Sequence, residues 1–367
     1  MKFLFVVQGE GRGHLTQAIT VEEMLRRNGH EVVEVLVGES SSRKLPGFFN
    51  RSIHAPVKRF LSPNFLPTAA NKRVNTFGSV AYNLLHCPAY FRSACYIKKR
   101  IEESGADMVI NFYELLTGFT YLLFAPRVPY ICIGHQYLFL HRSFEFPKKN
   151  AFEIGLLKFF TQLTSMGARE RLALSFCSMP DDAGKRIKVI PPLLRSDVLV
   201  TEPCEGDYIH GYMVNAGFGE SVLAWHEGHK SVPMHFFWDK PDEPLIKHVD
   251  DTLAFQQLDD VEFLRRMAGC KAYATTAGFE SVCEAMYLGK PMMMVPAHIE
   301  QDCNAYDAAK NGAGIVSSDF DIDRLLAFVQ DYTPNKAFVH WVKSCERLFL
   351  YAIELSNVAP CTFSQAI

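Results

Sequence analysis

The chain has 367 residues, of which 48% are apolar and 21% are charged. This length is too great for one compact core and predicts two domains of ordinary size. The formal net charge of −2 provides no overall field that would attract a polyanion, and no nucleic-acid-binding motif is present, so nucleic acid is not expected as a partner. The ten cysteines include no Cys-x-x-Cys pair and predict reduced, buried thiols in the cytoplasm.

The sequence shows no pattern that is typical of a membrane-inserted segment. The apolar run near the N-terminus, Phe3 to Val7, is shorter than the apolar region of a secretory signal peptide. No run of about 18 apolar residues is present, so we expect no transmembrane helix. The expected location is therefore the cytoplasm.

The chain opens with a buried strand, residues 2–7, which is followed by a glycine-rich turn and a helix. A second strand at residues 31–37 completes a β-loop-α-β unit and predicts a doubly wound parallel sheet. The turn at residues 9–14 places His14 where a dinucleotide-binding loop needs glycine, which argues against nicotinamide binding. His14 is a candidate base because a neutral imidazole can take a proton near pH 7. The alternative is a hydrogen-bonded structural histidine.

Residues 43–100 hold eleven Lys or Arg and no Asp or Glu. Aromatic and apolar residues are interspersed among these cations, and prolines interrupt the segment. A solvated basic face is the ordinary interpretation, but the complete absence of acids favours binding of an anion. Three ligands remain open: an anionic acceptor, an anionic membrane surface on the inner face of the membrane, or nucleic acid, which is the least expected.

Two further predicted strands of the first half end in polar side chains. Glu114 follows a strand at residues 107–111, and His135 follows a strand at residues 129–134. Because parallel sheets bind ligands at the carboxyl ends of their strands, both side chains are expected near a cleft. For Glu114 the alternative is an exposed loop carboxylate. Helical spacing over residues 151–166 predicts core packing, with a membrane-contacting face as the alternative.

A proline-containing segment divides the chain. We expect a first domain at residues 1–195, a linker at 196–206, a second domain at 207–335 and a C-terminal segment at 336–367. The second domain opens with a strand and a turn that contains Gly217. A strand-to-helix turn of this kind presents backbone N–H groups and is a possible phosphate contact.

The most informative stretch runs from residue 274 to residue 305. It predicts a strand, a turn of small residues at 276–278, a helix and a second strand. Gly289 and Pro291 end the helix, and the wholly apolar run that follows is typical of a strand buried on both faces. The turn presents free backbone N–H groups at a helix N-terminus, which favours an anion, most often phosphate.

Polar side chains near this turn suit the rest of a nucleotide sugar. Ser281 and Glu284 lie three positions apart and share one helix face. A carboxylate there repels phosphate but suits a pair of ribose hydroxyls. Glu300 and Gln301 are predicted on a loop at the carboxyl end of the next strand, where they suit sugar hydroxyls. The stretch therefore predicts phosphate, ribose and sugar contacts in chain order.

This stretch resembles the donor-binding signature of GT-B glycosyltransferases, especially the nucleotide-sugar transferases that include bacterial lipid II N-acetylglucosaminyltransferase, macrolide glycosyltransferases and UDP-glucuronosyltransferases. The opening loop at residues 9–14 resembles the first loop of the same family. At residues 276–278 those proteins have His-Gly-Gly or His-Cys-Gly, so a His contact to the diphosphate is missing here. Besides the turn, the resemblance rests on Ser281, Glu284, Gly289, Pro291, Pro296, Glu300 (usually Asp), Gln301, Asn304 and Ala305.

The resemblance implies two Rossmann-like doubly wound domains that face each other across a cleft, with the C-terminal helix crossing back to the first domain. It implies an inverting transfer of a sugar from a nucleotide diphosphate sugar, most simply UDP-linked, to a hydroxyl acceptor that is small, glycan or lipid-linked, with an anionic acceptor as one alternative. No metal or other cofactor is expected, since helix N-termini neutralise the leaving diphosphate. The run of Asp319, Asp321 and Asp323 precedes apolar residues at helical spacing, so Asp319 or Asp321 is predicted to cap that helix and a metal site is not expected.

The resemblance also implies roles for single residues. His14 would be the base that faces the acceptor, and Glu114 would be its acidic partner, two residues after the position where relatives carry Asp. The expected acceptor-side residues are Gly11, Gly13 and His135. The expected donor-binding residues are Gly217, Leu258 (near the nucleobase), Thr276, Ala277, Gly278, Ser281, Glu284, Glu300 and Gln301.

Two rival functions keep the same fold. A nucleotide-sugar epimerase would turn over the sugar nucleotide without an acceptor. A non-catalytic, transferase-like binding protein is the other rival, because the turn at residues 276–278 departs from the family pattern. Neither the sugar nor the acceptor follows from the fold.

Overall fold

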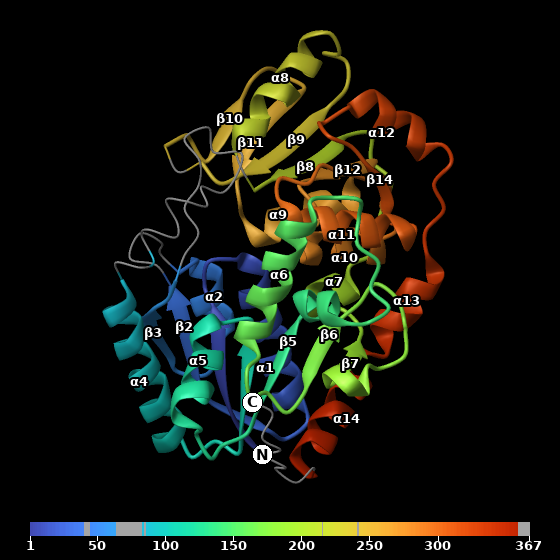
Figure 1. The fold of residues 1–367 in the computed structure, drawn as a ribbon. Coiled ribbons are helices and arrows are strands. Elements are labelled where there is room, and N and C mark those ends of the chain that lie inside the picture. Colours follow the sequence, from blue (N-terminus) through green and yellow to red (C-terminus); the bar gives the residue numbers. More distant parts are fainter. Residues whose placement is uncertain (40–44, 64–82, 84–85, 215, 241, 359–367) are drawn as a thin grey trace.

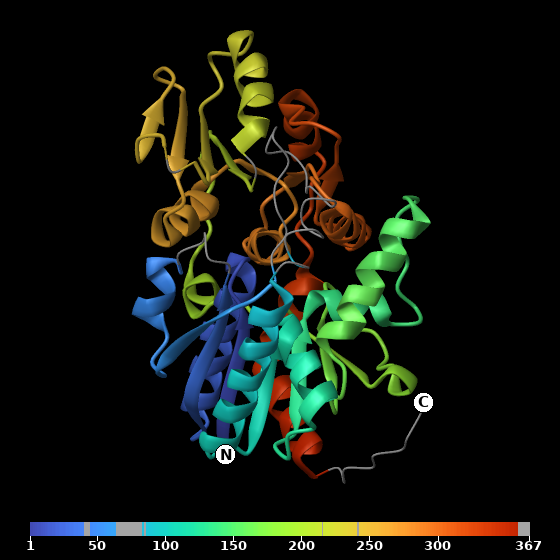
Figure 2. The same cartoon turned by 60° about the vertical axis from the view of Figure 1, so that its left-hand side comes forward.

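The computed structural model describes residues 1–39, 45–63, 83, 86–214, 216–240 and 242–358. These residues form two α/β domains, each built on a seven-stranded sheet, with one domain stacked above the other in Figure 1. The turned view in Figure 2 shows helices lining the region between the two sheets. The expectation of two doubly wound, mainly parallel sheets is confirmed.

The N-terminal sheet has the strand order β3-β2-β1-β4-β5-β6-β7, and every pairing is parallel. Its central strands β1, β4 and β5 are apolar runs that are buried on both faces, as expected when helices cover both sides of a sheet. The strands are β1 Lys2–Gln8, β2 Glu31–Glu39, β3 Val57–Leu61, β4 Met108–Phe112, β5 Tyr130–Gly134, β6 Arg171–Leu174 and β7 Ile187–Ile190.

The helices of this half include α1, which begins at Arg12, so His14 lies in its first turn and not in the preceding loop. Two arginines in the last turn of α1 complement the helix dipole, and Gly29 follows with a positive φ of 74°. The helical segments are α1 Arg12–Arg27, α2 Gly47–Ser52, α4 Cys87–Glu103, α5 Leu115–Phe124, the 3₁₀ turn His135–Leu140, α6 Ala151–Thr164, the 3₁₀ turn Ala183–Lys185 and α7 Ser196–Val200.

The C-terminal sheet has the order β10-β11-β9-β8-β12-β13-β14. Only its edge pair, β10 with β11, is antiparallel among the pairings of the described residues. The strands are β8 Ile209–Met213, β9 Met234–Trp238, β10 Ile246–His248, β11 Leu253–Gln257, β12 Ala272–Thr275, β13 Met292–Met294 and β14 Gly314–Val316.

The helices of the second half depart from the sequence prediction at two places. Glu300 and Gln301 lie in the first turn of a helix and not on a loop, and the predicted last helix is broken into two at Ser344. Asp321 caps its helix through the Arg324 N–H at 3.1 Å, as predicted. The helical segments are the 3₁₀ turn Ala216–Phe218, α8 Gly219–Glu227, α9 Asp260–Gly269, α10 Phe279–Tyr287, α11 Ile299–Lys310, α12 Ile322–Val329, α13 Lys336–Lys343 and α14 Cys345–Val358.

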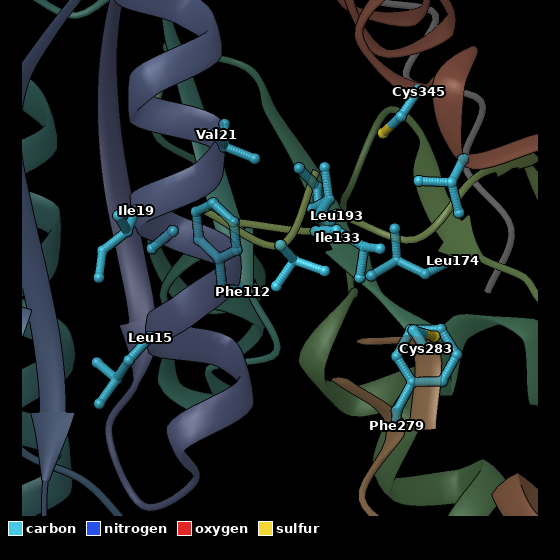
Figure 3. Close-up of a cluster of buried hydrophobic side chains, with 14 of the residues drawn as sticks. Leu15, Ile19, Val21, Phe112, Ile133, Leu174, Leu193, Phe279, Cys283 and Cys345 are labelled. Atoms are coloured by element: carbon cyan, nitrogen blue, oxygen red, sulfur yellow. The ribbon is translucent and has the colours of Figure 1, made fainter. Parts of the chain in front are cut away.

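One apolar cluster extends through both halves of the molecule. In Figure 3, Phe279 and Cys283 of α10 belong to the same apolar cluster as Leu174 and Leu193 of the N-terminal half. All four side chains are at least 95% buried, so the interface between the two halves is packed like a core. The two halves are therefore held in a defined arrangement by burial of apolar surface.

The C-terminal helices α13 and α14 contact the first half. Trp341 donates a hydrogen bond from Nε1 to the Ser175 carbonyl at 2.9 Å. Arg27 of α1 pairs with Glu346 at 3.0 Å, and Arg169 donates to the Ser356 carbonyl at 2.8 Å. Figure 1 shows these red helices descending along the N-terminal domain.

Two helix glycines give a matched test of the packing of α5 against α6. A Cβ at Gly118 of α5 would overlap the Leu163 carbonyl of α6, whereas one at Gly155 of α6 would meet nothing within 4 Å. Gly118→Ala should lower the free energy of unfolding by about 1–3 kcal/mol, the usual cost of overpacking. Gly155→Ala should raise it by up to about 1 kcal/mol through helix propensity. Urea unfolding measures both, and equal effects would contradict the close helix contact.

Candidate functional site

The N-terminus of α1 in the first half meets the N-terminus of α10 in the second half. Gln17 of α1 donates from Nε2 to Glu280 Oε1 of α10. A Cβ at Gly13 would overlap the Glu280 carboxylate where it now lies, so this carboxylate occupies space that a side chain at residue 13 would take. A third link joins Gln136 Nε2 to Glu300 Oε1 at 3.0 Å. These contacts place the predicted acceptor-side loop against the predicted donor-side helix.

His14 lies in this contact region and is 7% exposed. Its ring stacks on Tyr113 with a centroid distance of 5.4 Å, and its Nδ1 lies 3.4 Å from Gln17 Oε1. Burial lowers the pKa of His14, and the charge of Glu300 and the contact with Gln17 oppose this shift. A lowered pKa keeps the imidazole neutral at pH 7, which is the form that can accept a proton.

Tyr113 was not identified from the sequence. It has a positive φ of 61°, which is a strained conformation for a bulky residue, and its hydroxyl lies 2.8 Å from Thr161 Oγ1. Such strain persists only where the surroundings fix the residue, and here it presents the ring to His14. Its place directly after β4 was the only sequence feature that pointed to it.

The structure does not pair Glu114 with His14. Glu114 caps α5, and its Oε1 accepts hydrogen bonds from Ser62 Oγ at 2.6 Å and from the Leu116 N–H at 3.1 Å. Asn111 Oδ1 accepts from the Glu114 N–H at 3.0 Å, and this turn directs the carboxyl group toward the cap. Burial raises the pKa of Glu114 to about 7. Among the described residues, no hydrogen bond joins its carboxyl group to His14.

His135 is 1% exposed and packs inside the interface between the two halves. Its ring stacks on Phe279 at 4.0 Å, and its Nδ1 lies 2.7 Å from the Leu174 carbonyl oxygen. Burial lowers the pKa of His135 to about 4. The structure thus places this predicted acceptor-side residue among aromatic side chains and not on an accessible wall.

The turn at residues 276–278 leads directly into the N-terminus of α10, where the sequence predicted an anion site. Thr276 Oγ1 accepts a hydrogen bond from the Val214 N–H at 3.1 Å, so this side chain ties the end of β8 to the end of β12. Ala277 is fully buried with a positive φ of 61°. Gly278 is the N-cap of α10 and supplies no side-chain cap. Apart from the N–H of Glu280, to which its own carboxylate bonds, the first-turn backbone N–H groups of α10 have no side-chain cap from Gly278 and could face an anion.

Glu284 has a partner that the sequence did not reveal. Its Oε1 accepts a hydrogen bond from Arg195 Nε at 2.9 Å, and the two side chains are 6% and 18% exposed. Arg195 bonds to Oε1 of Glu284, so the Oε2 atom of the same carboxylate is left for a further hydrogen-bond donor. Ser281, one turn earlier, donates to the Gly278 carbonyl at 3.2 Å. Arg195 stands just before α7, in the segment interpreted only as the domain boundary.

The remaining predicted donor residues lie at strand ends or in the first turns of helices. Gln301 Oε1 accepts from the Ala297 N–H at 2.8 Å, so its amide holds the loop before α11. Leu258 follows β11 and packs at the edge of the largest apolar cluster. Gly217 lies in the 3₁₀ turn after β8. Gly11 is the N-cap of α1, and a Cβ there would meet only His14 Cδ2 at 3.9 Å, so space alone does not require glycine.

Glu280 and Gln17 are site residues that sequence reasoning missed. Burial raises the pKa of Glu280 to about 7, and the nearby charges of Glu300 and Glu284 act in the same direction. The carboxylate also accepts from its own backbone N–H at the start of α10. A carboxylate inside an expected phosphate-binding turn was the available sequence feature, but its partner Gln17 lies 263 positions away.

The basic segment at residues 43–100 is neutralised in part by acids from outside it. Arg100 and Lys58 both pair with Glu34 of β2, at 2.8 Å and 2.6 Å, and Arg59 pairs with Glu39. Residues 43–44, 64–82 and 84–85 of this segment lie outside the described residues. None of the helices in the described ranges is long and apolar enough to cross a membrane. Membrane contact through this segment therefore stays a prediction.

Two Rossmann-like domains that meet at the carboxyl ends of their strands define the GT-B fold, and the chain is a GT-B glycosyltransferase. The model of glycosyl transferase family 1 matches residues 1–333, and the chain belongs to this family. No curated protein matches the chain.

Solved structures are similar to the chain over nearly their whole length. The glycotransferase of kitacinnamycin has a TM-score of 0.60 at 15% identity, with 97% of each chain covered. The spinosyn forosaminyltransferase SpnP has a TM-score of 0.61 at 12% identity, covering 98% of this chain and 100% of its own. Arabidopsis thaliana UGT89C1 complexed with UDP-L-rhamnose has 0.62 at 12%, covering 97% and 98%. At this identity the likeness shows the fold.

The buried position of His135 predicts a loss of stability in acid. The unfolded chain binds a proton at its histidines near pH 6.5, whereas in the folded protein the pKa of His135 is about 4, so stability falls as the pH drops from 6.5 toward 4. Between pH 7 and pH 5 this one residue should remove about 2 kcal/mol of unfolding free energy. His135→Phe keeps the stack on Phe279, so urea unfolding should show a shallower acid loss by that amount. An acid loss as steep as that of the wild type would contradict the assignment.

Proposed function

We propose that the protein is an inverting glycosyltransferase that moves a sugar from a UDP-linked donor to a hydroxyl acceptor without a metal. The observation that carries the proposal is the contact between the turn of His14 and the N-terminus of α10. This juxtaposition sets a candidate base from one domain against an anion site from the other. UGT89C1, which shares the fold, was solved in complex with UDP-L-rhamnose and with UDP.

The donor would bind along the second half. The diphosphate would lie at the backbone N–H groups of the α10 N-terminus, beside Gly278 and Ser281, with Gly217 as a further contact. The free oxygen of Glu284 would hold the ribose hydroxyls, and Leu258 would lie near the nucleobase. Glu300 and Gln301 would bind hydroxyls of the transferred sugar.

The chemistry would be a single displacement. His14 Nε2 takes the proton of the acceptor hydroxyl, whose oxygen then attacks the anomeric carbon on the face opposite the diphosphate. The bond between that carbon and the phosphate oxygen breaks, and UDP leaves with the electron pair. The charge of Glu300 favours the imidazolium that forms, and the α10 dipole stabilises the leaving diphosphate.

The acceptor would approach past α6, which supports an apolar or lipid-linked molecule. Phe152, Leu156 and Phe159 form one stripe on this helix and are 76%, 48% and 56% exposed. The other face of α6 reaches the site, where Phe160 lies 5.8 Å from Tyr113. The described cations of residues 43–100 would favour an acceptor that bears phosphate or carboxylate, or a peripheral contact with an anionic membrane.

The ribose assignment has a direct test in nucleotide binding. Glu284→Ala should weaken UDP binding by about 1–3 kcal/mol, the scale of a lost charged hydrogen bond. The same change should not affect binding of 2′,3′-dideoxy-UDP, which lacks the hydroxyls. Isothermal titration gives both values, with GDP, dTDP and NAD as further ligands.

Arg195→Ala is the companion variant, because it disturbs the Arg195–Glu284 pair but leaves the carboxylate. Equal weakening of both nucleotides in Glu284→Ala would show that the pair is only structural. If no nucleoside diphosphate binds the wild type, the donor assignment fails. The rival function of a non-catalytic binding protein would also need a ligand at the N-terminus of α10.

The base assignment predicts a separation of catalysis from binding. His14→Ala should leave the affinity for UDP unchanged. It should slow the formation of UDP from UDP-glucose about 10²- to 10⁴-fold, since no base then takes the proton of the attacking hydroxyl. A panel of alcohol and phenol acceptors would be assayed for UDP release by the wild type and by the variant. Turnover of UDP-glucose to another UDP-sugar without an acceptor would favour the epimerase. Equal rates in both proteins would remove His14 from the mechanism.

A further inference from the structure

We propose that Gln17 and Glu280 are the positioning residues of His14: together they hold its imidazole as the Nδ1–H tautomer and leave Nε2 free to accept a proton. The proposal rests on the role of His14 in the proposed function. It replaces Glu114, which bonds elsewhere, with a carboxylate that the other domain supplies.

The three side chains form a continuous chain of contacts. Gln17 donates from Nε2 to Glu280 Oε1, and Gln17 Oε1 lies 3.4 Å from His14 Nδ1. Gln17 is 1% exposed, so water does not compete for its amide. His14 and Gln17 are three positions apart on α1 and therefore share one helix face.

The direction of each hydrogen bond follows from what each group can do. An ionised carboxylate only accepts, so Glu280 must face the amide NH₂ of Gln17. The amide oxygen of Gln17 is then turned toward His14, and this oxygen also only accepts. The proton of a neutral His14 must therefore be on Nδ1. Glu280 thus sets the tautomer of a ring that it does not touch.

The relay crosses the interface between the two domains. His14 and Gln17 belong to α1, whereas Glu280 belongs to α10. The carboxylate lies against Gly13, in space that a Cβ at residue 13 would take. The base is consequently aligned only when the two helix N-termini are in contact, which is the arrangement that would also bring donor and acceptor together.

Protonation of Glu280 reverses the relay. A protonated carboxyl group can donate to Gln17 Oε1; the amide then turns over and donates from Nε2 to His14 Nδ1, which moves the ring proton to Nε2. Burial raises the pKa of Glu280 to about 7, so this change falls near neutral pH. The charged groups that face Glu280 are Glu300 and Glu284. His14 faces the charge of Glu300 and the ring of Tyr113, whose phenol is titratable but neutral near pH 7.

The test reads the ring directly and needs no substrate. Nitrogen NMR of the full chain labelled with ¹⁵N-histidine distinguishes the two tautomers, and the spectrum of His14→Gln identifies the His14 signals. At pH 8 the wild type should show Nδ1–H. In Gln17→Met the ratio of Nδ1–H to Nε2–H should fall at least about fivefold, since a hydrogen bond of about 1 kcal/mol is lost. In the wild type the ratio should fall in the same way as the pH drops through 7.

Glu280→Gln keeps the shape of the side chain but can face Gln17 with either end of its amide, so the tautomer preference should disappear at every pH. Glu220→Gln is the matched control, because Glu220 is an exposed residue in the first turn of α8 and should leave the His14 signals unchanged. Circular dichroism checks that each variant is folded. Nε2–H in the wild type, or an unchanged ratio in both Gln17→Met and Glu280→Gln, would overturn the relay.

The rate at which UDP is formed from UDP-glucose gives the second measurement. In Gln17→Met, kcat should fall about tenfold or more with KM for UDP-glucose unchanged, because the base and not the donor site is disturbed. A wild type with the Nδ1–H tautomer but no turnover would defeat the proposed function and leave the relay intact. Turnover that is insensitive to Gln17→Met, together with an unchanged tautomer, would defeat the relay alone.

Discussion

The arrangement of this molecule depends on one contact, that between the N-termini of α1 and α10. Phe279, the first residue of α10, is buried against His135 and Leu174 of the other domain. This apolar packing fixes the distance between the two helix N-termini. With that distance fixed, the polar side chains at the termini have little freedom. Glu280 meets Gln17, and Glu300 meets Gln136. The apolar interface is therefore a condition for the polar site, since a small change in the angle between domains would separate both pairs.

Much of the fold follows from the sequence because its causes are local. Wholly apolar runs predict the central strands, and Gly or Pro residues mark the ends of α1 and α10. The prediction failed where a tertiary contact decides the outcome. Glu300 and Gln301 follow a strand and have the polarity of a loop, but they begin α11. The last predicted helix is divided at Ser344, where the sequence has no proline or glycine that would indicate a break.

The sequence predicted where the site residues lie in the fold better than it predicted which side chains they contact. The turn at residues 276–278 and the place of His14 after β1 follow from strand-to-helix patterns, whose geometry is local. The partners of these residues come from distant parts of the chain: Arg195 for Glu284 and Gln17 for Glu280. For Glu114 the sequence suggested a contact, with His14, that the structure does not contain. Glu114 lies two residues after the position where relatives carry the acidic partner of the base, but hydrogen bonds to Ser62 and to the cap of α5 hold its carboxyl group elsewhere.

The side chains around the α10 N-terminus impose a last constraint on any donor. Glu280, Glu284 and Glu300 bring carboxylates to this region, and Thr276 turns its hydroxyl inward to β8. Arg195 offsets only Glu284, to which it is bound. A diphosphate here would therefore depend on backbone N–H groups and the helix dipole more than on cationic side chains, and each nearby carboxylate would raise the cost of its charge. A proton taken up by Glu280 reduces that repulsion, so the affinity of this site for a diphosphate and the protonation of Glu280 must be linked.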